Sequence, residues 1–76
     1  MGEHHIGETI RARREGVYLS KRKLAAEADI NIKTLRLIEQ GKVNPRKSTV
    51  KLLDRALKVY ELCAALKRKE LEQKHE

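Results

Sequence analysis

Positively charged side chains are the most abundant chemically active groups in the sequence, and they are unevenly distributed. Between Ser20 and Lys58 there are 11 Lys or Arg residues against 4 Asp or Glu, whereas Val59 to Glu76 contains 4 of each kind. The whole net charge of +7 at pH 7 therefore lies in the middle of the chain. Such a surface suits a phosphate backbone, because neutralising the phosphates releases their counterions. The charge count alone is equally compatible with a role in solubility.

Groups for catalysis or metal binding are scarce. Among the 76 residues we find no glycine-rich phosphate loop, no paired-carboxylate site, and no Ser or Cys that can be matched with a His and an acid. His4 and His5 are adjacent, without a Cys or an acidic pair at ligand spacing, so we predict no metal site. A chain this short can barely enclose a pocket. The sequence predicts a protein that is not an enzyme and uses no cofactor.

The cationic segment begins with two short helices that meet at a turn. Ser20 and Asn31 are good N-cap residues, and each is followed by apolar residues at helical spacing. Gly41 can end the second helix in the left-handed conformation. We expect helices over Ser20 to Ala28 and Asn31 to Gln40, which together make a helix-turn-helix unit. The residues expected to point inward are Leu24, Ala25, Ala28, Ile30, Leu35 and Ile38.

These features, extended into both flanks, resemble the Cro/repressor-type helix-turn-helix family of lambda-repressor-like domains. The resemblance runs from Ile6 to about Val59 and depends on Gly7, Ile10, Arg14, Ser20, Leu24, Ala25, Ile30, Asn31, Leu35, Ile38, Glu39, Gly41, Asn44, Pro45 and the segment from Thr49 to Leu57. The sequence also departs from the family pattern. Asp29 stands where Gly is usual in the turn, Lys21 where Gln is frequent, Arg13 and Lys47 where apolar residues are common, and Lys58 where Gly usually ends the fourth helix.

The resemblance implies a compact all-α domain of four to five helices that binds double-stranded DNA, with the helix Asn31 to Gln40 in the major groove. Lys and Arg on this helix can donate hydrogen bonds to guanine edges. The expected base contacts, taken to lie opposite Leu35 and Ile38, are Ile32, Lys33, Arg36 and Leu37. The expected contacts to the DNA backbone are Ser20, Lys21, Arg22, Thr34, Gln40, Lys42, Asn44, Arg46 and Lys47. An ion pair between Arg14 and Glu39 is also implied.

The chain is expected to divide near residue 58. Residues 1–5 are predicted as a flexible N-terminus, residues 6–58 as the helix-turn-helix domain with its first helix over Ile6 to Glu15, and residues 59–76 as an extended C-terminal helix. Because no helix breaker follows Lys58, either the fourth helix continues or a fifth begins near Val59. Cys63 is expected to pack as a small apolar residue. The C-terminal segment also carries an apolar row that is a candidate dimer interface or an intramolecular lid, namely Val59, Leu62, Cys63, Leu66 and Leu71.

We predict a sequence-specific regulator of transcription, of the repressor kind, that works as a homodimer in the cytoplasm of a bacterium and is of the type that phages and plasmids encode. The single cysteine, and a sequence without an apolar run of about 20 residues or a signal peptide, favour this compartment. Two other classes use the same fold. One is a protein-interaction module whose partner binds Ile32 and Leu37, and the other is an antitoxin-like protein whose partner binds the C-terminal helix. An excisionase or other architectural role is a further alternative.

Overall fold

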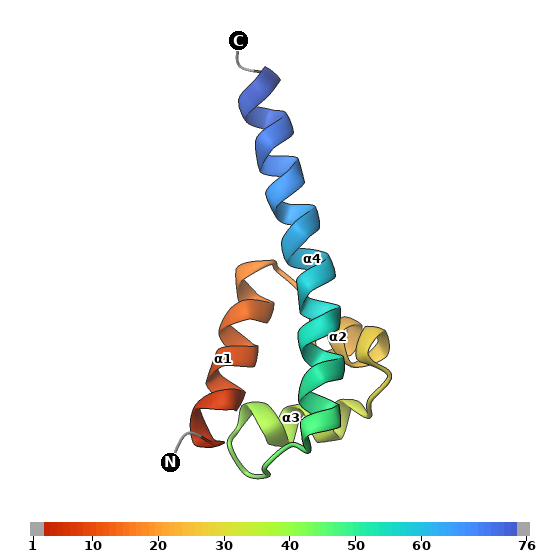
Figure 1. Ribbon diagram of the computed structural model, residues 1–76. Coiled ribbons are helices and arrows are strands. Elements are labelled where there is room, and N and C mark those ends of the chain that lie inside the picture. The colour runs from red at the N-terminus through yellow and green to blue at the C-terminus, as the bar shows by residue number, and fades with distance from the viewer. Residues whose placement is uncertain (1–2, 75–76) are drawn as a thin grey trace.

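Four helices, α1 (Glu3–Gly16), α2 (Lys21–Ala28), α3 (Ile32–Glu39) and α4 (Lys47–Lys74), make up the computed structural model (Figure 1). The structure describes the backbone of residues 3–74 and the side chains of residues 6–69. The side chains of His4, His5 and Leu71 lie outside this described part. Within residues 3–74 every regular element is helical, which confirms the predicted all-α fold. Helix α1 begins at Glu3 rather than at Ile6.

The two helices of the helix-turn-helix unit begin at the predicted cap residues. Ser20 Oγ accepts a hydrogen bond from the Lys23 N–H at 3.0 Å, and Asn31 Oδ1 accepts one from the Lys33 N–H at 2.8 Å. Both cap residues have extended backbone conformations, as N-caps require. Both predicted N-caps are thus confirmed, and a cap of this kind contributes about 1 kcal/mol.

The first three helices end in one common way, with a single residue in the left-handed backbone conformation. The φ angles are 56° at Tyr18, 57° at Asp29 and 74° at Gly41, after α1, α2 and α3 respectively. In each case the next N–H reaches back to the last helical turn, as from Lys42 to the Leu37 carbonyl at 2.9 Å. This is the Schellman arrangement. Asp29 can stand where the family usually has Gly because Asp tolerates a positive φ better than most residues.

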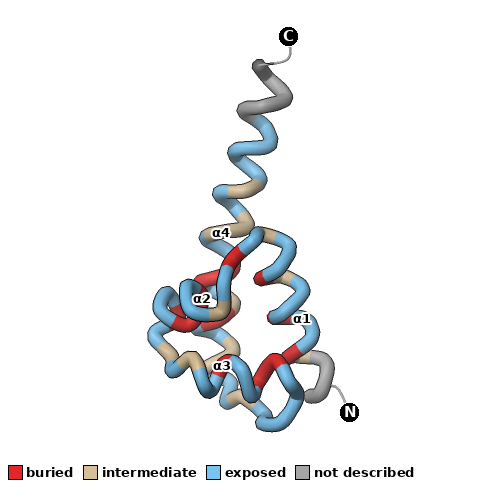
Figure 2. The backbone as a smooth tube through the Cα atoms, turned by 180° about the vertical axis from the view of Figure 1, so that it is seen from behind, coloured by how far each residue is buried: buried red, intermediate tan, exposed pale blue. Residues whose placement is uncertain are grey.

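Leucine, isoleucine and alanine side chains from all four helices form the core. Helix α2 packs against α3 and α4, and α1 also contacts α3 and α4 (Figures 1 and 2). The residues predicted to point inward from the helix-turn-helix unit are buried, apart from Ile30 in the turn between α2 and α3, which is half-buried. Burying a leucine contributes about 1.5–3 kcal/mol. The most deeply buried side chains are Leu24, Leu35, Ile38, Leu53 and Leu57.

Helix α4 continues without a break from Lys47 to Lys74, so the first of the two predicted arrangements of the C-terminal segment is correct. A helix of 28 residues is about 42 Å long, and its C-terminal half projects beyond the other helices (Figure 1). Lys58 permits this continuation because Lys is a good helix former, unlike the Gly of the family pattern. The prediction that Cys63 packs as a core residue is wrong, because Cys63 lies on the projecting half and is exposed.

Arg13 ties α1 to the beginning of this projecting half. Its guanidinium donates to Asp54 Oδ1 at 2.8 Å and to the two carboxylate oxygens of Glu61 at 2.7 and 2.8 Å. Glu61 lies three residues beyond Lys58, so it is available only because α4 continues past the position where the family helix ends. These ion pairs explain why Arg13 can stand at a position where the family pattern commonly has an apolar side chain.

The Arg13 cluster predicts a pH dependence of stability. Hydrogen bonds from Arg13 hold the pKa of the Glu61 and Asp54 carboxyls below their usual range. A carboxyl with a lowered folded-state pKa stabilises the fold above its ordinary pKa of about 4, and this stabilisation is lost as the pH falls through the folded-state value. We therefore expect stability to decline below about pH 5. The variant Arg13→Met should show a smaller decline when urea midpoints are compared from about pH 7 to about pH 3.

Arg11→Met is the matched control for this experiment, because it removes an exposed ion pair with Glu15 on the same helix. We expect it to follow the pH profile of the unmodified protein. An Arg13→Met profile that runs parallel to that of the unmodified protein would contradict the assigned role of the cluster.

Candidate nucleic-acid interface

Helix α3 turns one face to the core and the other to solvent. Leu35, Ile38 and Glu39 are buried, whereas the intervening residues are exposed. With 3.6 residues per turn, exposed positions three or four residues apart share one face. That outer face carries two cations, one amide and one apolar side chain, namely Lys33, Arg36, Gln40 and Leu37.

Ile32 does not share this outer face. It is half-buried and packs against the hydrophobic core, so the expected position opposite Leu35 and Ile38 is wrong for this residue. The reason is helical geometry, since Ile32 precedes Leu35 by three residues and therefore lies near it on the helix surface. A contact between Ile32 and DNA bases stays a prediction. Only the exposed part of its side chain is available for such a contact.

The residues predicted to contact the DNA backbone lie at the start of α2, on α3 and in the segment from Gln40 to Lys47 that follows it. Lys21 is half-buried and Arg22 exposed in the first turn of α2, where Ser20 Oγ is already engaged as the N-cap. The other predicted residues of this group are all exposed, namely Thr34, Gln40, Lys42, Asn44, Arg46 and Lys47. The first turns of α2 and α3 contain no acidic residue. Cations at these helix starts are unfavourable beside the helix dipole unless an anion lies nearby.

The one acidic residue between Asn31 and Lys47 is Glu39, and it is neutralised inside the protein. Arg14 donates to its two carboxylate oxygens at 2.9 and 3.0 Å, and a third hydrogen bond joins Arg14 to the Leu19 carbonyl at 2.9 Å. The hydrogen bonds to Glu39 raise the pKa of the Arg14 guanidinium, against the opposing effect of burial. The pair joins α1 to α3 and removes the only negative charge from the segment that carries the outer face.

The cations of this segment, in contrast, are uncompensated. Within the described side chains, the ion pairs involve Arg11, Arg13, Arg14 and Lys58 as cations. The remaining cations of the helix-turn-helix and its loop form no such pair, namely Lys21, Arg22, Lys23, Lys33, Arg36, Lys42, Arg46 and Lys47. This surface is therefore positively charged and ready to accept an anionic partner.

Leu37 lies in an open groove of about 390 Å³ between α3, the following loop and the start of α4. Leu37 and Val43 are each 39% exposed there, and an apolar side chain of this kind can contact a thymine methyl group. Neither Val43 nor Thr49, which also lines the groove, is among the predicted site residues. An apolar residue within a polar loop is the one signal in the sequence that points to Val43.

The chain matches the model of a known protein family. A family model described as "Helix-turn-helix domain" matches residues 5–66, which is most of the sequence. No curated protein and no solved structure matches the chain. None of the helices in the described part is long and apolar enough to cross a membrane. Proteins with this domain bind DNA and typically are not enzymes. The chain belongs to the Cro/repressor-type helix-turn-helix family of DNA-binding proteins.

Proposed function

We propose that the protein is a sequence-specific regulator of transcription, of the repressor kind, that inserts α3 into the major groove. The observation that supports this most is the set of unpaired cations on the outer face of α3 and on the loop after it. In the proposal, Arg36 and Lys33 donate to guanine edges and Leu37 contacts thymine methyl groups. Occupation of a short operator then blocks RNA polymerase. Regulation of transcription takes place beside the DNA, so a cytoplasmic site of action belongs to the proposal.

Selection from a random DNA library tests this function. It is performed at about 150 mM salt, where the Debye length of about 8 Å weakens non-specific attraction. We expect recovery of a short consensus sequence. Recovery of bulk DNA without a consensus would contradict sequence-specific regulation. Two half-sites about 34 Å apart in the consensus would indicate that two copies bind together.

The variant Arg36→Ala is expected to lose about 1–3 kcal/mol of binding free energy on the best site, and to relax the preference at one base position. Lys21→Ala and Arg46→Ala should weaken binding to all sequences alike and lower the salt slope by about 1. Affinity is measured by fluorescence anisotropy over a salt series. Arg68→Ala is the control, because this exposed arginine lies on the projecting half of α4. An unchanged base preference in Arg36→Ala would exclude the proposed reading role of Arg36.

A protein-interaction module is the second candidate, and the groove around Leu37 favours it. Leu37→Asp would then abolish partner binding while DNA binding stays weak and independent of sequence. Leu37 is the better residue to test, because Ile32 also packs against the core and Ile32→Asp would disturb the fold. In the antitoxin-like alternative the partner binds the projecting half of α4 instead.

Formation of a homodimer through the predicted C-terminal row stays a prediction. Of its members, Val59, Leu62, Cys63 and Leu66 are exposed in the single chain, whereas the side chain of Leu71 lies outside the described residues. Because these side chains are exposed, another molecule can bind them. The charged residues around them influence which molecule binds.

A further inference from the structure

Helix α4 has a second apolar face that no part of the described chain covers. Its members lie at spacings of seven, three and four residues, which places them on one side of a helix. Their exposed fractions are 40%, 55%, 65% and 61% at Leu52, Val59, Leu62 and Leu66, and we call these four residues the outer row. The core side of the same helix instead carries Leu53, Leu57 and the half-buried Tyr60.

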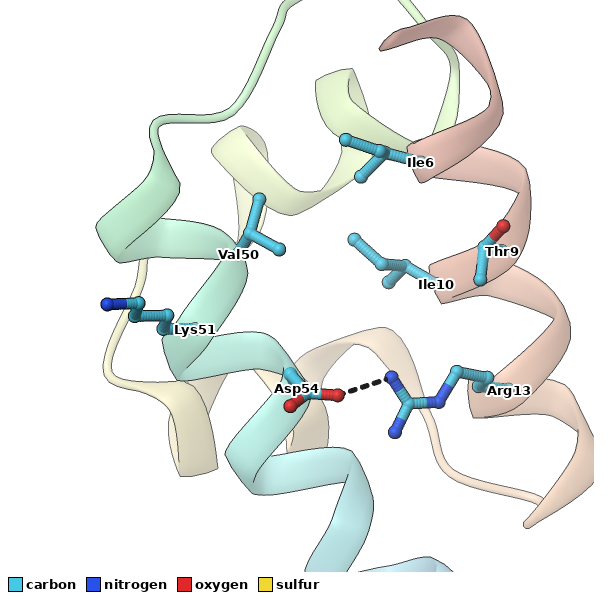
Figure 3. Close-up of a pocket in the computed structure, with 7 residues that line it drawn as sticks. All are labelled: Ile6, Thr9, Ile10, Arg13, Val50, Lys51 and Asp54. Atoms are coloured by element: carbon cyan, nitrogen blue, oxygen red, sulfur yellow. Dashed lines mark hydrogen bonds and ion pairs between the residues drawn. The ribbon is translucent and has the colours of Figure 1, made fainter. Parts of the chain in front are cut away.

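Cations border the outer row and interrupt it. Arg55 and Lys69 occupy positions within the same seven-residue pattern, and Lys51 and Lys58 lie along one edge. A shallow depression on this side of α4 is lined by Lys51, Asp54, Arg55, Lys58, Val59 and Leu62. Asp54, the one carboxylate in that lining, already accepts a hydrogen bond from Arg13 (Figure 3) and forms an ion pair with Lys58. Among the described side chains, the surface thus combines an apolar row with three cations that form no ion pair, namely Lys51, Arg55 and Lys69.

We infer that the outer row binds an amphipathic helix of a partner protein, whose apolar side chains are bordered by Asp and Glu. Helices pair through apolar side chains at this spacing, and the charges beside the row select the partner. Carboxylates facing Arg55, Lys51 and Lys69 would supply the ion-pair partners that the described side chains of the chain do not provide. This inference goes beyond DNA binding and does not depend on it.

A second copy of the chain is a poorer match to this charge pattern. Pairing the two outer rows in parallel would set Arg55 against Arg55 and Lys69 against Lys69, which is repulsive. An antiparallel pairing would set these cations against the apolar members of the row. In neither arrangement does a free carboxylate of the described side chains face them, because Asp54 and Glu61 are held by Arg13.

An anionic membrane is also a poorer match. Helices that lie on membranes need a broad apolar face, whereas the outer row is narrow and is interrupted by Arg55 between Leu52 and Val59. A narrow row of this kind fits the ridge of another helix better than it fits a bilayer.

The test uses the full chain and two synthetic peptides of about three heptads each. Both have Leu or Ile at the a and d positions, and the bordering e and g positions are Glu in one peptide and Lys in the other. Self-repulsion of the bordering charges keeps each peptide monomeric. Fluorescence anisotropy at micromolar concentrations should show that the Glu peptide binds at least tenfold more tightly than the Lys peptide.

Two variants make the test specific. Leu62→Glu should weaken binding of the Glu peptide at least tenfold, and Arg55→Glu should reduce the preference for the Glu peptide over the Lys peptide. Both side chains are exposed, so circular dichroism should show unchanged folding. Arg36→Ala on α3 should bind the Glu peptide normally, and Leu62→Glu should retain its affinity for a single DNA half-site. These two controls separate a failure of this inference from a failure of the proposed function.

Several results would overturn the inference. Equal binding of both peptides, or binding of neither, would show that the charge pattern selects no acidic helix. A dimer in analytical ultracentrifugation that Leu62→Glu dissociates would identify a second copy as the occupant. Binding to vesicles of anionic phosphatidylglycerol that Leu62→Glu abolishes would identify a membrane instead.

Discussion

Replacing Glu39 by Ala is expected to remove about 3–5 kcal/mol from the free energy of unfolding, because it leaves the Arg14 guanidinium buried without its counter-charge. Arg14 and Glu39 are each only 8% exposed, and the two hydrogen bonds between them measure 2.9 and 3.0 Å. A domain of this length has a total stability of about 4–11 kcal/mol. The variant should therefore lose a large part of its stability, as urea and thermal unfolding followed by circular dichroism would show.

The double variant Arg14→Met/Glu39→Leu separates the cost of an unpaired charge from the value of the pair itself. Replacing both partners by apolar residues of similar volume is often close to neutral, so the double variant should be more stable than Glu39→Ala alone. It should also place an uncharged side chain at position 39 without changing the exposed cations of α3. A Glu39→Ala protein that unfolds at the same urea concentration as the unmodified one would contradict a structural role for the pair.

Gly7→Ala should destabilise the protein by about 3 kcal/mol, the upper part of the range for overpacking. A methyl group on Gly7 would run into the backbone carbonyl oxygen of Ile38, and it would lie 3.1 Å from the carbonyl carbon of that residue and 3.2 Å from Glu39 Cα. Backbone atoms at the C-terminal end of α3 cannot move aside as a flexible side chain can. Helix α1 would have to shift away from α3, which would also stretch the hydrogen bonds between Arg14 and Glu39.

Gly16→Ala is the matched control, because a methyl group there meets nothing within 4 Å. Alanine has a higher helix propensity than glycine by about 1 kcal/mol, so this variant should unfold at the same urea concentration or a higher one. Equal stability of Gly7→Ala and Gly16→Ala would show that α1 and α3 are not packed as closely as described.

The local features of this protein could be predicted from its sequence. Ser20 and Asn31 cap the helices because their side-chain oxygens reach the free N–H groups of the first turn. Gly41 and Asp29 end helices because both residue types accept a positive φ. The apolar periodicity of Leu24, Leu35 and Ile38 correctly predicted the core face. Each of these features depends on residues within one or two helical turns of one another, which is the range that spacing in a sequence reports.

Contacts between distant segments were decided by the tertiary structure. Arg13 meets Asp54 and Glu61, which lie 41 and 48 residues away, only because α4 continues past Lys58 alongside α1. The same continuation leaves Cys63 and the outer-row residues beyond Lys58 in solvent, whereas a helix that broke at residue 58 could have turned them toward the core. Sequence spacing defines which residues share a face of a helix, but the packing of the other helices determines which of those faces is covered.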